Sequence, residues 1–126
     1  MSLFRKSPEK IAQKAEIRTE IERLRALSDN ELAIMLLPPL GPDGINPGSS
    51  SRPQQLCIYL LREFPGSGLR DELELMSSVR RGLERLEQLR LVRPISHQRS
   101  PVWRITHLGE ETLASRTVEQ RVTEGT

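Results

Sequence analysis

The chain has 126 residues, of which 36% are hydrophobic and 29% are charged, enough to fill one small core but not two. Its formal net charge of +2 excludes a polycation, so any binding of nucleic acid has to depend on where the charges lie. The single cysteine excludes an intramolecular disulfide, and since neither a signal-peptide core nor a membrane-spanning apolar run is present, we expect a cytoplasmic protein that does not enter a membrane.

The first predicted element is a helix from Pro8 to about Leu27. Proline suits the first position of a helix, and no glycine or further proline interrupts the segment. The apolar residues recur at spacings of four, three and three, which places them in one stripe: Ile17, Ile21, Leu24 and Leu27. Such a stripe either packs within the chain or binds a second copy to form a homodimer through the N-terminal helices. The sequence leaves both interpretations open.

A second helix is predicted after Ser28. Ser28 and Glu31 match the capping-box pattern, in which each side chain binds the main-chain N–H of the other residue. Residues 32–37 are apolar on nearly every side, which indicates a buried helix. Pro38 and Pro39 are expected to end it, because the residue before a proline is pushed out of the helical conformation.

Three helices are predicted between Pro53 and Leu89. The first begins at Pro53 and ends at a stop rich in proline and glycine, and a short helix follows at residues 69–75. Ser77 or Ser78 is expected to cap the third helix, which runs to about Leu89. The residues expected on its inward face are Val79, Leu83, Leu86 and Leu89.

Two short extended runs follow, at residues 91–96 and 102–105. They are joined by a polar tip at residues 97–100, and this pattern is typical of a β-hairpin. Trp103 and Ile105 alternate along the second run, so they share one face and can cover a helical core. The hairpin is therefore expected to be the only sheet.

The chain is predicted to contain one domain with additions at both ends. Residues 38–52 are rich in proline, glycine and serine and are interpreted as a linker. After the hairpin, Thr106 is expected to cap a last helix that runs to about Gln120. The predicted division is an N-terminal helical extension at 1–37, the linker at 38–52, the domain at 53–120 and a flexible tail at 121–126.

Two stretches resemble motifs of a known family. Residues 83–93, LERLEQLRLVR, resemble the end of the recognition helix and the first wing strand of MarR-type and PadR-type bacterial repressors. Residues 103–109, WRITHLG, resemble the passage from their second wing strand into the last helix. The resemblance covers roughly residues 54–115. It implies a winged helix-turn-helix fold, mainly α with a two-stranded hairpin, and a DNA-binding transcription regulator.

One residue departs from the pattern of that family. Arg90 stands where these repressors have glycine or asparagine at the end of the recognition helix. A left-handed conformation there would strain an arginine. We therefore expect that either the turn differs from that of the family or the alignment with the family slips by one residue at this position.

Positive charge is concentrated where such a fold would meet DNA. Residues 76–105 carry seven arginines and two glutamates, which gives +5 in a chain of net +2. We expect the helix at 78–89 to enter a major groove and the hairpin tip to approach the minor groove or the phosphates. The residues expected to contact DNA are Ser77, Ser78, Arg80, Arg81, Arg85 and Arg99.

Two alternatives stay open. The arginines at 78–89 are also what a solvated helix face paired with Glu84 and Glu87 would carry. The acidic residues at 71–74 favour a winged-helix module that binds another protein and does not read DNA.

Nothing in the sequence predicts an enzyme, a metal site or a cofactor. His97 and His107 lack the spaced partners that a metal site needs. Cys57 lies on an apolar helical face, which is typical of a small core residue. The acidic residues fall on amphipathic helices without an apolar pocket, so no catalytic group is expected.

Overall fold

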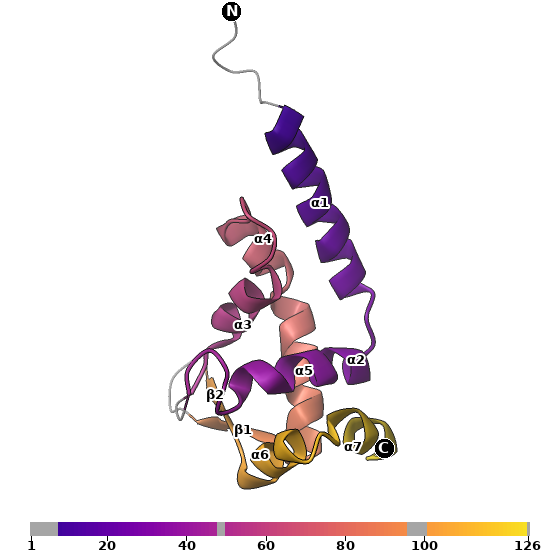
Figure 1. Cartoon of the computed structure of the whole chain (residues 1–126), viewed down its shortest axis with the longest axis vertical. Helices are drawn as coiled ribbons and strands as arrows, with labels where there is room; N and C mark the ends of the chain where they lie inside the picture. The colour runs from indigo at the N-terminus through magenta and orange to yellow at the C-terminus, as the bar shows by residue number, and fades with distance from the viewer. Residues whose placement is uncertain (1–7, 48–49, 96–100, 126) are drawn as a thin grey trace, which may run out of the picture.

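The computed structural model describes residues 8–47, 50–95 and 101–125, and these residues are mainly helical with one two-stranded antiparallel sheet (Figure 1). This composition agrees with the predicted α+β class. In chain order the elements are α1 (Pro8–Arg25), α2 (Asp29–Leu40), α3 (Pro53–Leu60), α4 (Leu69–Glu74), α5 (Met76–Gln88), β1 (Val92–Ile95), β2 (Val102–Ile105), α6 (His107–Ala114) and α7 (Val118–Glu124).

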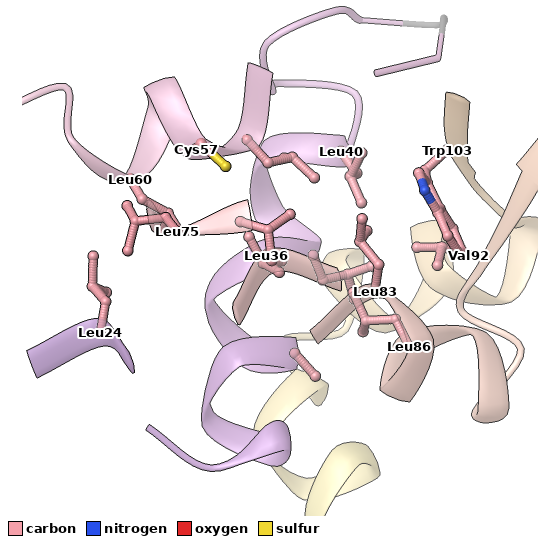
Figure 2. Packing of buried hydrophobic residues seen from close by; sticks show 14 of the residues in the cluster. Leu24, Leu36, Leu40, Cys57, Leu60, Leu75, Leu83, Leu86, Val92 and Trp103 are labelled. Carbon is pink, nitrogen blue, oxygen red and sulfur yellow. The ribbon is translucent and has the colours of Figure 1, made fainter. Parts of the chain in front are cut away.

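The centre of the structure is the packing of α2 against α5, which is more extensive than that of any other pair of described elements. Gly82 of α5 lies at the contact, where an added Cβ would come within 2.5 Å of Leu36 Cδ1 and 3.0 Å of Leu32 Cβ. Figure 2 shows Leu36 and Leu83 in the middle of the hydrophobic cluster. The segment that the sequence assigned to an N-terminal extension thus supplies a helix of the core.

The α2 helix runs to Leu40, so the prediction that Pro38 and Pro39 end it is wrong. Both prolines lie in its last turn. A proline holds φ at about −65°, which fits a helix. Because proline lacks an N–H, the only hydrogen bond lost is the one to the carbonyl one turn earlier. Leu37 and Leu40 are buried in the core, and this burial offsets the unfavourable conformation before each proline.

The apolar stripe of α1 packs within the chain. Three of its residues are buried in the core: Ile17, Ile21 and Leu24. An ion pair between Arg18 and Glu74 ties α1 to α4. The N-terminal half of α1, residues 8–16, contains no buried residue, and the N-terminal end of the helix extends past the other helices (Figure 1). The homodimer stays a prediction, and it would have to use a surface other than the stripe.

The predicted hairpin is confirmed. The strands β1 and β2 pair antiparallel, and Val92 and Trp103 are buried on the side that faces the core. Ser51, just before α3, adds one isolated bridge: its N–H donates to the Trp103 carbonyl at 2.9 Å, and its carbonyl accepts from the Trp103 N–H at 2.7 Å. The predicted tip lies within residues 96–100, outside the described residues.

The last helix is shorter than predicted. Thr106 caps α6 as expected, since its Oγ1 accepts a bond from the Gly109 N–H at 3.1 Å. The helix nevertheless stops at Ala114 and does not reach Gln120. The chain turns at Arg116, whose φ of 59° is incompatible with continuing a right-handed helix.

The expected flexible tail at 121–126 is helical as far as Glu124. The α7 helix begins at Val118 and places Val122 in the core with no exposed surface. The Val122 carbonyl also accepts a bond from Arg85 of α5 at 3.2 Å. These contacts come from distant parts of the chain, so the polar composition of the tail did not reveal them.

Arg90 adopts a left-handed conformation, with φ of 63°. The expectation of a different turn or a slipped alignment at this position is therefore wrong. Its N–H donates to the Glu87 carbonyl, and the Leu91 N–H donates to the Leu86 carbonyl, both at 2.9 Å. These two bonds are the Schellman pattern that ends many helices, in which glycine is the usual left-handed residue. Arg116 ends α6 in the same conformation.

Replacing Arg90 by glycine should raise the free energy of unfolding by about 1 kcal/mol. The left-handed conformation costs a residue with a Cβ about 1–2 kcal/mol, and glycine avoids this cost. Glycine also has more conformational freedom in the unfolded chain, which reduces the net stabilisation. Urea denaturation measures the difference. Arg90→Ala keeps the Cβ and serves as the control, so equal stability of the two variants would contradict the prediction.

Candidate nucleic-acid interface

The α5 helix begins at Met76, and its cap is the buried Leu75 rather than a serine. Leu75 alone separates α4 from α5, and its burial fixes the start of α5 ahead of the serines. The prediction that Ser77 or Ser78 caps this helix is therefore wrong, since both lie inside its first turn. Ser77 is exposed, whereas Ser78 is 2% exposed and belongs to the packed interior.

Arg81 is bound to the turn between α1 and α2. Its guanidinium donates to Asp29 Oδ1 at 3.0 Å and to the main-chain carbonyls of Arg25 and Leu27 at 3.4 and 3.5 Å. Arg25 is the last residue of α1, so Arg81 also supplies a donor at the negative end of that helix. A side chain expected to contact DNA thus holds α1, α2 and α5 together.

Arg85 joins α5 to two other helices. Its Nε donates to Asn30 Oδ1 of α2 at 2.8 Å, and one terminal nitrogen donates to the Val122 carbonyl of α7 at 3.2 Å. The other terminal nitrogen donates to Gln88 Oε1 at 3.2 Å. Neither Arg81 nor Arg85 pairs with the glutamates of α5, so the ion pairs expected for a solvated helix face are absent from these two side chains.

The exposed face of α5 is one stripe of five residues: Ser77, Arg80, Glu84, Glu87 and Gln88. Arg80 lies at the N-terminal end of the stripe, and no hydrogen bond or ion pair joins it to another described residue. The two glutamates occupy the C-terminal half. The stripe is therefore positive at its start and negative beyond it.

The outer face of the hairpin carries two arginines that the sequence analysis did not select. Arg93 and Arg104 lie directly opposite each other in the register of β1 and β2, and both are exposed. Like charges in such a cross-strand pair repel each other, so this pair is unfavourable for folding by itself. The adjacent pair on this face is Ile95 and Val102. Arg99, the arginine expected at the tip, lies outside the described residues.

The acidic segment before α5 has partners inside the chain. Asp71 Oδ2 accepts a bond from the Gly68 N–H at 3.0 Å, where α4 begins. Glu74 pairs with Arg18 of α1. Two of the three acids that counted against DNA binding are thus engaged in local and interhelical contacts.

Cys57 is buried in the core, as the sequence predicted. Burial raises the pKa of its thiol to about 12, and the nearby Glu72 carboxylate adds to the rise. A thiol with such a pKa is not a reactive thiolate near neutral pH. Within the described ranges, no group of histidine, cysteine, aspartate and glutamate is arranged to hold a metal ion.

Comparisons with known proteins found no relative. No protein-family model, no curated protein and no solved structure matches the chain. The winged-helix resemblance therefore rests on the motifs at 83–93 and 103–109. Among the helices that the structure describes, none has the length and apolar character needed to cross a membrane.

Proposed function

We propose that the chain binds duplex DNA as a small transcription regulator of the winged-helix type, through the N-terminal end of α5 and the β1–β2 hairpin. The observation that carries this proposal is the exposed Arg93–Arg104 pair on the hairpin that follows α5. Phosphates bound by the two guanidinium groups would offset their repulsion with charge-assisted hydrogen bonds. Exposed Arg80 and Arg90 extend the positive surface to both ends of α5.

The charges on α5 set how it would meet a duplex. Glu84 and Glu87 repel phosphates, so the helix approaches with its N-terminal end, where the helix dipole is also positive. Arg80 and Ser77 are the exposed side chains there. These two residues are the ones that would read bases, because Arg81 and Arg85 are engaged in hydrogen bonds to other parts of the chain. Most of the affinity then comes from phosphate contacts.

Binding to a random-sequence duplex should weaken about 100-fold between about 50 and 200 mM salt, as expected for roughly four phosphate contacts. Arg93→Gln and Arg104→Gln should each lower the slope of log affinity against log salt by about one, because each removes one phosphate contact. Fluorescence anisotropy with a labelled duplex measures the affinity at each salt concentration.

Arg121→Gln is the matched control, because it removes the same charge from an exposed position on α7. Its slope should stay that of the wild type. Duplex binding that is absent, or that ignores salt, would contradict the proposed function. An equal loss of slope in the control would show that net charge acts in place of the hairpin.

A second candidate is a module that binds another protein. Two observations favour it: Glu84 and Glu87 are exposed on α5, and Leu69 and Leu73 of α4 are 58% and 54% exposed. Exposed leucines one turn apart are typical of a contact surface. The salt series separates the two candidates, since a protein-binding module has no reason to bind random duplexes.

A further inference from the structure

Two further arginines lie on the face of α5 that meets the start of α2. Arg81 and Arg85 lie one turn apart on α5, and Asp29 and Asn30 lie next to each other in the first turn of α2. Arg81 donates to Asp29 Oδ1 at 3.0 Å, and Arg85 donates to Asn30 Oδ1 at 2.8 Å. Two guanidinium groups are thus held side by side against two adjacent acceptors.

The charges of this cluster do not balance. Among the acceptors that the described residues supply to the two arginines, Asp29 is the only carboxylate, since the others are the amides of Asn30 and Gln88 and main-chain carbonyls. Within the described part of the chain, Arg85 therefore binds only neutral acceptors. A cluster with two positive charges and one negative charge attracts a further anion.

The one carboxylate is also easy to displace. The side chains of Arg81 and Asp29 are 40% and 56% exposed, so their ion pair lies at the surface. Exposed ion pairs contribute little to stability, because water and salt screen them. A phosphate offers more acceptor oxygens to the arginine forks than the carboxylate does, and it binds them with charge-assisted bonds.

We infer that Arg81 and Arg85 form an anion site in which Asp29 acts as a built-in competitor, and that a nucleic-acid phosphate takes this site by displacing Asp29. The inference rests on the proposed function, because it adds a phosphate contact to the same DNA complex. In the free protein the two arginines brace α2 against α5. In the complex, Arg81 leaves Asp29 for the phosphate. Asp29 thereby lowers the affinity of the free protein for DNA.

The test measures the affinity of the full chain for a short random-sequence duplex by fluorescence anisotropy at low salt. Asp29→Asn should raise the affinity about threefold, the size expected for the loss of one competing exposed ion pair. Glu22→Gln removes the same negative charge from an exposed position on α1, and it should give a smaller gain. Thermal unfolding of each variant confirms that it is folded.

A double substitution shows whether Asp29 acts through Arg81. In an Arg81→Gln background, Asp29→Asn should raise the affinity no more than Glu22→Gln does, because the competing pair is already gone. If Asp29→Asn and Glu22→Gln have equal effects in the wild-type background, the inference is overturned while the proposed function stands. A threefold gain that persists without Arg81 also overturns it. A chain that binds no duplex overturns both proposals.

Discussion

Replacing Gly82 by valine should lower the free energy of unfolding by about 3 kcal/mol, the upper part of the range for adding atoms to a packed core. A Cβ at this position would lie 2.5 Å from Leu36 Cδ1 and 3.0 Å from Leu32 Cβ. Leu32 and Leu36 are fully buried, so neither side chain can move away without disturbing the core. The helices α2 and α5 would have to separate along the contact that forms the centre of the molecule. Urea denaturation followed by circular dichroism measures the loss.

Glu84→Val is the control for this substitution. It places the same β-branched residue two positions further along α5, on the exposed stripe. There valine meets no neighbour and loses only helix propensity, less than about 0.7 kcal/mol. At Gly82 the change to valine improves helix propensity, so only the close approach of α2 explains a large loss there. Equal losses in the two variants would contradict that close approach. The packing of α2 on α5 would then be wrong.

Replacing Leu86 by alanine should cost about 2–5 kcal/mol, the range for removing a leucine side chain from a packed core. Leu86 is fully buried, and Trp103 is also buried, as the sequence predicted for both. Figure 2 shows Leu86 on the same side of the cluster as Val92 and Trp103 of the hairpin. The substitution would therefore open a cavity where α5 supports the hairpin.

Leu73→Ala serves as the matched control. It removes the same atoms from α4, where Leu73 is 54% exposed, and less burial is lost with them. The loss of unfolding free energy should be clearly smaller than for Leu86. A loss below about 1 kcal/mol for Leu86→Ala would contradict its place in the core, since such a value is typical of a half-exposed site.

The sequence predicted best the features that neighbouring residues determine. The capping box of Ser28 and Glu31 is present, with the Glu31 N–H bound to Ser28 Oγ and the Ser28 N–H bound to Glu31 Oε1, both at 3.1 Å. The Thr106 cap and the hairpin strands follow equally local rules. Each of these depends on residues a few positions apart, which a single sequence shows directly.

The candidate site was predicted less well, because its side chains have distant partners. Arg81 binds Asp29, 52 residues away, and Arg85 binds Asn30, 55 residues away. No local pattern shows that two arginines of an amphipathic helix will face another helix instead of solvent. The alternation of side chains along a strand predicts that Arg104 points outward, since its neighbour Trp103 points inward. Its pairing with Arg93 needed the strand register, which the alternation alone does not fix.

The start of α1 changes how the molecule moves through water. Five residues of helix, 8–12, precede Gln13, which lies near Gly66, and they add about 7 Å of rod at 1.5 Å per residue. A projecting helix increases the hydrodynamic radius by a larger proportion than it increases the mass. The 14.4 kDa chain should therefore elute early from a gel-filtration column even as a monomer. Its state of association has to be read from scattered light, which reports mass directly.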